Sequence, residues 1–226
     1  MPRSLLRFLS AVILSLVTHA VSATPEEGKN FSTLMPPQPT TQTNRIEVVE
    51  FFSYACPHCA RFYPLLSAWV AKLPKDVLFR RVPVGFNRDL WVNMQRTYYA
   101  LESTGDLARL DGPLFHALHE ERKPLFEESA IAEWVGRNGG DADRFASAYT
   151  SLPINEKSFK ADEMAENYRI LGVPALAIDG RYVTHVAEGS TDEDLALKEM
   201  LENADALIAR ERSERAAARA AAPKPK

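Results

Sequence analysis

Cys56 and Cys59 are the only cysteines in this chain of 226 residues, and they lie three positions apart. A mostly apolar run at 48–52 precedes them, and apolar residues recur at helical spacing from position 60 onward. This pattern predicts a strand that leads into a helix, with a dithiol at the junction. Residues i and i+3 of a first helical turn are close enough to form a disulfide, so the spacing indicates thiol–disulfide chemistry.

Three features of this junction favour a thiolate at Cys56. The first turn of a helix leaves backbone N–H groups unpaired, and these groups and the helix dipole stabilise a negative charge. Pro57 suits the first helical position, where a missing N–H has no partner to lose, and a protonated His58 adds a positive neighbour. A lowered pKa makes the thiol reactive, because the thiolate is the nucleophile. We expect Cys59, one turn further in, to be more buried and less acidic.

Two structural alternatives compete with redox chemistry at this pair. A disulfide that encloses four residues would stabilise the fold by only about 1.9 kcal/mol, against about 4.7 kcal/mol for a loop of a hundred residues. A zinc site built on C-x-x-C usually needs a second such pair, and the chain has no other cysteine. We therefore favour a redox role over both alternatives.

A second pair of candidate ligands is His116 and His119, which share one face of a predicted helix and are followed by Glu120. Metal ligation by such a pair is chemically reasonable. Histidines on a charged stretch are more often plain surface residues, so we predict no metal site.

The first 23 residues have the pattern of a signal peptide. Arg3 and Arg7 form a positive n-region, an apolar core covers 8–17, and Val21-Ser22-Ala23 offers small residues at a cleavage site. The apolar core is too short to span a bilayer comfortably. We expect cleavage after Ala23 and export to a compartment where disulfides persist.

Composition limits the class of protein. Hydrophobic residues make up 46% of the chain, which is enough to bury a full core in one or two domains. The formal net charge is −3, and it becomes more negative when the two arginines of the signal leave. This charge gives no reason to infer binding to nucleic acid.

Strand-like and helix-like runs follow one another in a clear order. The predicted strands cover 31–34, 46–53, 77–84, 173–178 and 181–184. The predicted helices cover 57–73, 89–103, 107–119, 129–138, 141–151, 158–171 and about 191–210, with Asp141 and Ser158 as N-caps.

This order predicts an α/β fold. A helix joins the strands 46–53 and 77–84, which favours a parallel pair with a right-handed crossover, and Asp179-Gly180 predicts a hairpin turn. No strand-like run appears between 87 and 171, so the helices there form an inserted subdomain. The expected domains are 24–86 together with 172–210, the insertion at 87–171, and a polar tail at 211–226, which we expect to be a solvated helix that frays.

Glu50 interrupts the strand 46–53, which is apolar on both sides like a central strand. A carboxylate buried beside a dithiol is a candidate functional group, because burial raises its pKa. The alternative is a structural glutamate paired with a cation.

Together these residues resemble the DsbA family of exported thiol–disulfide oxidases over about 31–208. The most specific segment is Glu-Phe-Phe-Ser-Tyr-Ala-Cys-Pro-His-Cys at 50–59, and the second is Gly172-Val173-Pro174 before a strand. The resemblance implies a thioredoxin fold with an inserted helical subdomain. Its Pro-His dipeptide is similar to that of oxidising members, whereas reducing thioredoxins typically carry Gly-Pro.

The resemblance also implies residue roles. Cys56 corresponds to the attacking surface cysteine and Cys59 to its buried partner, with His58 stabilising the thiolate and Glu50 as the acid beneath the dithiol. Arg81 stands where the family often has a lysine near that acid. Because arginine keeps its proton in proteins, we expect charge pairing there and not a proton relay through this side chain.

Val173 and Pro174 correspond to the family's substrate-facing loop, where the bond before the proline is cis and faces the dithiol. The implied cycle needs no cofactor other than the Cys56–Cys59 disulfide. Its implied partners are reduced or unfolded secreted polypeptides and a quinone-linked membrane oxidase of the DsbB type, in the periplasm, with the protein as a monomer. A disulfide isomerase or reductase would use the same residues, and a non-catalytic chaperone would not need Cys56.

Overall fold

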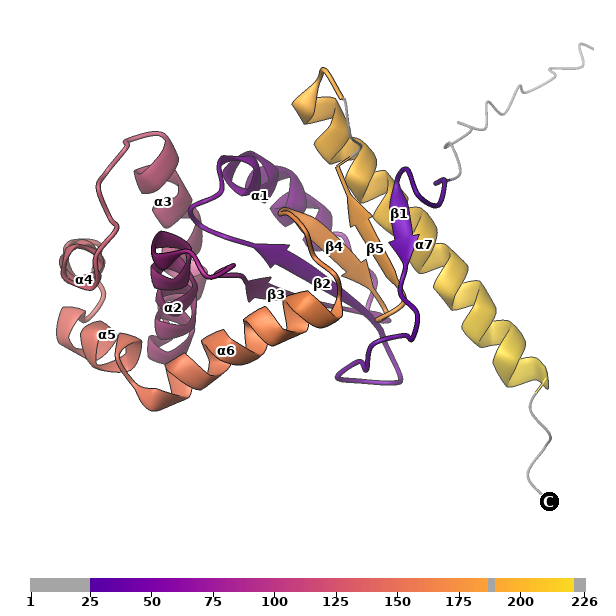
Figure 1. Ribbon diagram of the computed structural model, residues 1–226, viewed down its shortest axis with the longest axis horizontal. Coiled ribbons are helices and arrows are strands. Elements are labelled where there is room, and N and C mark those ends of the chain that lie inside the picture. Colours follow the sequence, from indigo (N-terminus) through magenta and orange to yellow (C-terminus); the bar gives the residue numbers. More distant parts are fainter. Residues whose placement is uncertain (1–24, 187–189, 222–226) are drawn as a thin grey trace, which may run out of the picture.

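The computed structural model describes residues 25–186 and 190–221, so the predicted signal peptide at 1–23 and the end of the tail at 222–226 lie outside the described residues. One mixed sheet of five strands, in the order β1-β5-β4-β2-β3, forms the centre of the molecule. Helices cover both faces of this sheet, and further helices lie beyond its β3 edge (Figure 1). The sheet and its helical layers give the α/β architecture that the sequence predicts.

The five strands match the predicted runs closely. They are β1 (Phe31–Thr33), β2 (Ile46–Phe52), β3 (Val77–Pro83), β4 (Ala175–Ile178) and β5 (Tyr182–His185). β2 and β3 are parallel, as predicted, and the other neighbours are antiparallel. The β4–β5 turn has positive φ at Asp179 and Gly180, which suits a tight hairpin. A Cβ at Gly180 would lie 2.0 Å from the carbonyl oxygen of Gln38, so only glycine fits there.

β2 lies between β4 and β3, and all seven of its residues are buried. Its side chains alternate between the two faces of the sheet. Ile46 and Val48 pack with the helices α1 (Pro57–Val70) and α7 (Glu193–Ala221), whereas Val49 and Phe51 pack on the opposite side with α6 (Leu152–Asn167). The strand also buries a second acid, Glu47, which sequence analysis did not single out and which pairs with Arg80 at 3.2 Å.

The helices between β3 and β4 are α2 (Asp89–Thr104), α3 (Leu107–His119), α4 (Glu128–Arg137), α5 (Ala142–Tyr149) and α6. Four of them lie within two residues of their predicted bounds, and Asp141 caps α5 by accepting a hydrogen bond from the Arg144 N–H at 2.9 Å. Treating 87–171 as one inserted subdomain remains our proposal.

The predicted bounds of α6 were wrong. The helix begins six residues earlier than predicted, with Ser151 as N-cap and a proline in its first turn, and it ends at Asn167. Ser158, the predicted cap, is a buried residue in the middle of the helix. Proline fits a first helical turn because it lacks a backbone N–H, and an N–H at that position would have no intrahelical partner; this signal was missed.

α7 continues into the predicted tail beyond 210, which is helical as expected but is not solvated throughout. It continues to Ala221, and Glu211 is only 3% exposed. Arg215 donates to the Asp179 carboxylate at 2.6 Å and to the carbonyl oxygen of Thr43 at 3.0 Å. Ion pairs therefore attach the first part of the predicted solvated tail to the β4–β5 turn, although it lacks an apolar stripe.

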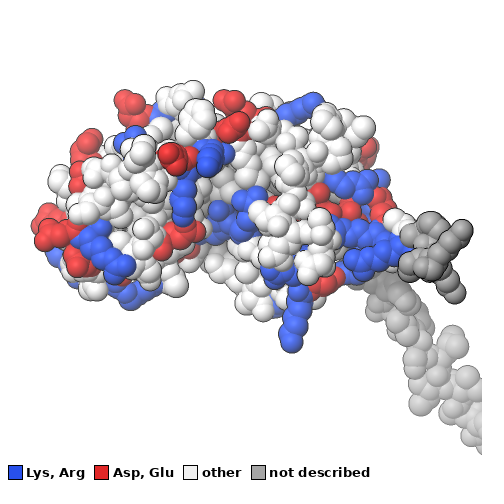
Figure 2. All heavy atoms as spheres, turned by 90° about the horizontal axis from the view of Figure 1, so that it is seen from below, with Lys and Arg blue, Asp and Glu red and all other residues white. Residues whose placement is uncertain are grey.

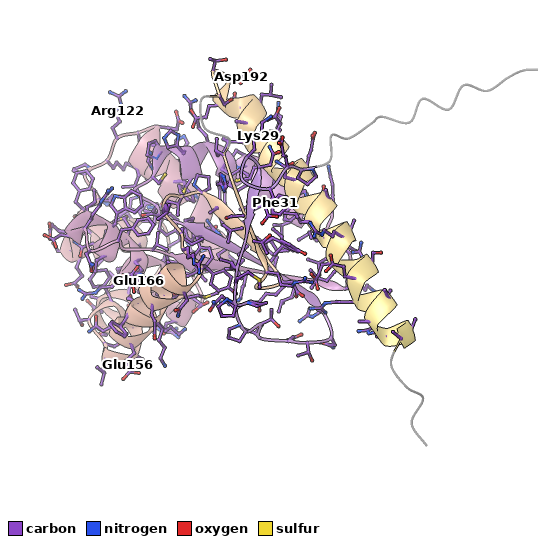
Figure 3. The ribbon with its side chains drawn as sticks, turned by 45° about the vertical axis from the view of Figure 1, so that its right-hand side comes forward. Lys29, Phe31, Arg122, Glu156, Glu166 and Asp192 are labelled. Atoms are coloured by element: carbon purple, nitrogen blue, oxygen red, sulfur yellow. The ribbon has the colours of Figure 1, made fainter. Side chains whose placement is uncertain are left out.

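The start of the chain and the last helix lie side by side. Figure 3 shows Phe31 of β1 next to α7 and Asp192 at the N-terminal end of that helix, and Phe31 belongs to the same buried cluster as Leu197. Within the described residues, no helix combines the length and the apolar character that crossing a membrane requires.

Candidate active site

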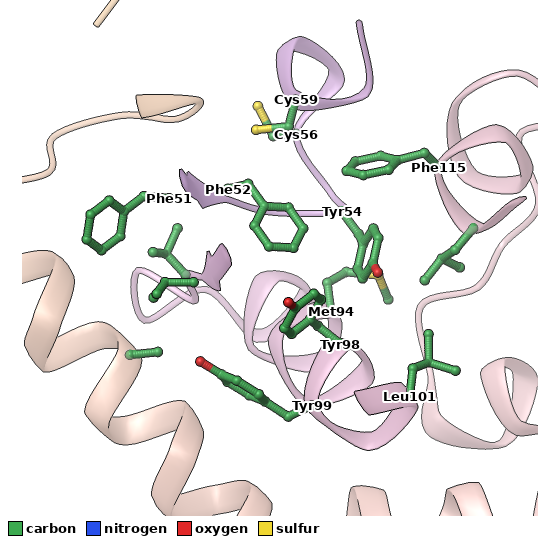
Figure 4. Packing of buried hydrophobic residues seen from close by; sticks show 14 of the residues in the cluster. Phe51, Phe52, Tyr54, Cys56, Cys59, Met94, Tyr98, Tyr99, Leu101 and Phe115 are labelled. Carbon is green, nitrogen blue, oxygen red and sulfur yellow. The ribbon is translucent and has the colours of Figure 1, made fainter. Parts of the chain in front are cut away.

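The dithiol lies where β2 passes into α1. Cys56 is the N-cap residue with an extended backbone, and Pro57 takes the first helical position. The Ala60 N–H donates to the Cys56 carbonyl oxygen at 3.1 Å, which closes the first helical turn over the pair. Both cysteines are free thiols, and their sulfurs lie next to each other in Figure 4. The predicted strand–dithiol–helix junction is present.

Cys56 is not the surface residue that the sequence led us to expect, because only 3% of it is exposed, against 0% for Cys59. The loop before β4 covers it. The Cys56 thiol donates to the carbonyl oxygen of Val173 at 3.4 Å. The Val173–Pro174 peptide bond is cis, as expected. The structure thus brings Val173, the residue before the cis proline, against Cys56.

The two thiols have very different acidities. The pKa of Cys56 is lowered to about 7, first by a hydrogen bond from the Cys59 thiol, then by the backbone N–H groups of Cys59 and His58 and by the charge of His58. Burial opposes these effects. The pKa of Cys59 is raised well above its ordinary value by burial and by its role as hydrogen-bond donor. Sequence analysis named the helix terminus and His58 but missed the largest cause, the neighbouring thiol.

His58 is exposed, and its ring contacts a residue that sequence analysis did not single out. Nδ1 of His58 pairs with the Glu193 carboxylate, and Arg61 donates to the other oxygen of that carboxylate at 2.6 Å. The hydrogen bond from His58 is the largest cause of the lowered pKa of Glu193. Because Glu193 is the first residue of α7, this contact joins the start of α7 to the active-site helix.

Glu50 is completely buried and is the neighbour of Arg81 in the parallel β2–β3 register. Nε of Arg81 donates to Oε2 of Glu50. Burial raises the pKa of Glu50, and the charge and hydrogen bond of Arg81 only partly oppose this. The predicted acid is therefore both buried and paired with the predicted cation.

Arg81 has a second carboxylate partner, Asp111, which comes from α3 and which sequence analysis missed. Nη1 of Arg81 donates to Asp111 at 2.7 Å, and the Tyr54 hydroxyl donates to the other oxygen of Asp111 at 2.5 Å. The guanidinium carbon lies 3.8 Å from the centre of the Phe52 ring. Arg81 is thus held on one side by an aromatic ring and on two others by carboxylates.

An aromatic cluster surrounds this ion network. Tyr54 meets Phe115 at 4.8 Å between ring centres and Phe52 at 5.4 Å, and these rings lie beneath the dithiol in Figure 4. Phe115 belongs to α3, so the cluster joins the proposed helical subdomain to the end of β2. The pKa of Tyr54 is raised well above its ordinary value, first by burial and then by the charge of Asp111.

His116 and His119 do not form a common site. His119 Nε2 lies 2.7 Å from the Tyr54 carbonyl oxygen, whereas His116 pairs with Glu121 at 3.1 Å. Within the ranges 25–186 and 190–221, no group of three or more potential ligands is arranged to hold a metal ion.

Comparison with known proteins decides the family. Residues 47–201 match the DSBA-like thioredoxin domain. The chain is 36% identical over 193 residues to the thiol:disulfide interchange protein DsbA of Bordetella parapertussis, covering 85% of this chain and 91% of that protein. It is also 36% identical over 204 residues to the protein of that name from Azotobacter vinelandii, covering 89% and 92%. The chain belongs to the DsbA family.

Solved structures of DsbA proteins agree with this assignment. The crystal structure of Pseudomonas aeruginosa DsbA has a TM-score of 0.76 and 35% identity, covering 83% of this chain and 94% of that one. The structure of the oxidoreductase DsbA from Xylella fastidiosa has a TM-score of 0.75 and 30% identity, covering 84% and 98%. The expected thioredoxin fold is confirmed, and this DsbA-family chain is a thiol:disulfide oxidoreductase. Its relatives support an oxidase role over the isomerase, reductase and chaperone alternatives.

A groove of about 640 Å³ opens beside the dithiol of this DsbA-family protein. Its lining includes His58, Glu193, Val173 and Pro174 together with apolar residues such as Ile170 and Leu171. Leu171 is 98% exposed. The groove therefore runs along the Val173–Pro174 loop, whose Val173 carbonyl oxygen contacts the Cys56 sulfur.

Proposed function

We propose that the Cys56–Cys59 disulfide of this protein is donated to reduced, exported polypeptides during oxidative folding. A client thiolate attacks the Cys56 sulfur, the Cys56–Cys59 bond breaks, and Cys59 leaves as a thiolate that takes up a proton. A second client thiolate then attacks the client sulfur of the mixed disulfide and releases the Cys56 thiolate. The client is oxidised by two electrons and the dithiol is reduced by two.

The observation that carries this proposal is the unequal acidity of the two thiols. A stabilised Cys56 thiolate stabilises the reduced form, so the disulfide accepts electrons more readily. Each unit by which the pKa falls corresponds to about 1.4 kcal/mol, or about 30 mV for a two-electron couple. In this scheme Cys56 is the sulfur that the client attacks and the leaving group of the second step. Cys59 is the leaving group of the first step, and Pro57 and His58 favour the Cys56 thiolate.

Val173 and Pro174 are the proposed client-binding residues. The Val173 carbonyl oxygen lies 3.4 Å from the Cys56 sulfur, so a client segment that enters the groove meets peptide backbone beside the reactive bond. Backbone hydrogen bonds of the strand-addition type do not depend on client sequence. Such binding suits an enzyme that accepts many unfolded chains.

The proposed location is the periplasm, after cleavage near Ala23, and the proposed reoxidising partner is a quinone-linked membrane oxidase of the DsbB type. The signal-like pattern at 1–23 supports export. We propose no nucleic-acid partner. The negative net charge supports this, and on the face shown in Figure 2 both signs of charge lie interspersed. We propose that the protein acts as a monomer.

The test uses the oxidised protein and a reduced peptide that carries two cysteines. We expect the protein to oxidise the peptide stoichiometrically. The reduction potential of the Cys56–Cys59 pair should be more oxidising than that of the peptide. Cys56→Ser should abolish the reaction. If the protein instead rearranges the non-native disulfides of a client without net oxidation, the result would favour isomerase function. Refolding activity that persists in Cys56→Ser would favour a chaperone.

A further inference from the structure

Two carboxylates share one buried guanidinium beneath the dithiol. Arg81 donates to Glu50 through Nε and to Asp111 through Nη1, the latter at 2.7 Å. The side chains of Arg81 and Asp111 are 11% and 13% exposed, and that of Glu50 is 0% exposed. One positive charge therefore faces two carboxyl groups where little solvent screens them, so the carboxyl groups compete for it.

Glu50 itself is incompletely satisfied. Its Oε2 accepts from Arg81, but its Oε1 is buried and has no hydrogen-bond partner among the described residues. A buried carboxylate oxygen without a partner disfavours the ionised form. The negative charge of Asp111 acts in the same direction, since it also raises the pKa of Glu50.

Titratable groups from several helices and strands surround Glu50. The charge of Glu50 contributes to the raised pKa of Cys59 on α1 and of Tyr98 on α2, so its carboxylate acts at both. The groups that act on Glu50, Arg81 or Asp111 are Arg81 from β3, Asp111 from α3, Cys56, Cys59 and Tyr63 from α1 and its N-cap, Tyr54 from the loop before α1, and Tyr98 from α2.

We propose that Asp111 is a positioning residue for thiol–disulfide exchange, which holds Arg81 between two carboxylates and so leaves Glu50 able to carry the Cys59 proton. This inference rests on the proposed function. Asp111 touches neither the substrate nor the sulfurs, and it acts through Arg81 and Glu50. Through Asp111, helix α3 of the proposed helical subdomain affects the protonation of Glu50 on β2.

The proton balance is simple. When a client thiolate breaks the Cys56–Cys59 bond, Cys59 leaves as a thiolate of high pKa, and a neutral Glu50 carboxyl group transfers its proton to that sulfur. The products are the Cys59 thiol and a Glu50 carboxylate, which Arg81 stabilises without giving up its own proton. Without Asp111, Arg81 would pair with Glu50 alone and would hold it ionised, so fewer molecules would have a proton to transfer.

The direct test is a titration of Glu50 by carbon NMR of protein labelled at the glutamate carboxyl carbon. The Glu50 signal is identified as the one that disappears in Glu50→Gln. Asp111→Asn should lower the titration midpoint of Glu50 by about one pH unit. Asp106→Asn is the matched control, because this carboxylate also pairs with an arginine of α3, Arg109 at 2.5 Å, and it should leave the midpoint unchanged.

The second readout is the pH dependence of peptide oxidation. Asp111→Asn should move the inflection that depends on Glu50 by the same amount, and in a Glu50→Gln background it should move nothing. An unchanged Glu50 midpoint in Asp111→Asn, or a shift of the oxidation profile that persists without Glu50, would overturn the proposal. Asp111→Ser carries the same prediction if the asparagine variant does not fold. Failure of the proposed function is distinguishable, because the wild-type protein would then not oxidise the peptide.

Discussion

The thiol of Cys56 donates to the carbonyl oxygen of Val173, 117 positions away in the chain, at 3.4 Å. The nucleophile is therefore covered by peptide backbone and remains only 3% exposed. We therefore attribute its reactivity to its lowered pKa and not to general solvent exposure. Selective chemistry at this sulfur follows from that arrangement.

Alkylation of the reduced protein should modify Cys56 and spare Cys59. The rate should rise with pH to a midpoint near 7, the pH at which the Cys56 thiolate forms. Cys59→Ala should raise this midpoint by about one unit, because the Cys59 thiol is the leading donor to that thiolate. Mass spectrometry of the labelled peptides checks both expectations. Equal labelling of the two cysteines would contradict the assignment of the nucleophile.

His58→Ala should raise the pKa of Cys56 and make the disulfide less oxidising, by about 30 mV for each unit of pKa. The rise in the Cys56 pKa should be smaller than in Cys59→Ala, since the charge of His58 is the smallest of the causes named above that lower this pKa. Equilibration of His58→Ala and of the wild-type protein with glutathione measures the two reduction potentials, and the pH dependence of alkylation gives the Cys56 pKa in His58→Ala and Cys59→Ala. An unchanged potential would mean that the hydrogen bonds to the thiolate are sufficient alone.

Glu50→Gln should stabilise the protein at neutral pH. The folded-state pKa of Glu50 is raised, so its contribution to stability is fully present below its unfolded pKa and is lost as pH rises through the folded value. The gain on substitution is about 1.4 kcal/mol for each unit of that pKa difference. Urea unfolding near pH 4 and pH 7.5 should show the two proteins converging at the lower pH. A variant that is less stable at both pH values, with wild-type exchange rates, would make Glu50 a structural partner of Arg81.

Pro174→Thr should slow the release of clients, so that mixed disulfides between Cys56 and exported proteins accumulate. Pro174 lies in the groove beside the Val173 carbonyl group that contacts Cys56. Threonine adds an N–H and a hydroxyl group there, and both can hold a bound client segment. Non-reducing gels reveal the complexes. Val186→Thr, elsewhere in the same groove, is the control, and equal accumulation in both variants would remove the special role of Pro174.

Arg215→Ala should destabilise the fold by about 1–3 kcal/mol, because it leaves the buried Asp179 carboxylate without its main donor. The exposed Arg219, one turn further along α7, is the matched control, and its replacement by alanine should have little effect. The midpoint of urea unfolding distinguishes the two variants. The pKa of Cys56 should be the same in both, since the β4–β5 turn takes no part in the thiol chemistry.

Sequence analysis predicted the parts of the site that local signals encode. The C-x-x-C spacing, the apolar run of β2 and the Asp179-Gly180 turn each lie within a few residues, and each was found. The Cys56–Val173 contact spans 117 positions and the His58–Glu193 contact spans 135. The residues next to Cys56 and Glu193 in the sequence give no sign of these two contacts, so neither could be predicted from local patterns.

The missed start of α6 and the missed partner Asp111 have different causes. At α6 a local signal is present, because a proline follows Ser151 by two positions. Ser158 resembles an N-cap equally well in the sequence, and only the structure distinguishes the two. Asp111 lies within a helix as an ordinary polar residue, and only the tertiary packing of α3 brings it within 2.7 Å of Arg81. The identity of a buried ion partner depends on tertiary structure, which the sequence pattern does not contain.

The position of Asp111 has a consequence for hybrid proteins made from members of this family. The helices α2–α6 are encoded as one continuous segment between β3 and β4, which invites exchange of that segment as a unit. Such an exchange would transplant more than a surface, because α3 carries one of the two carboxylates that share Arg81. A recipient that keeps Glu50 and Arg81 would receive the donor's residue at the position of Asp111, and with it a different number of carboxylates around Arg81. The redox behaviour of the hybrid would then depend on both source proteins.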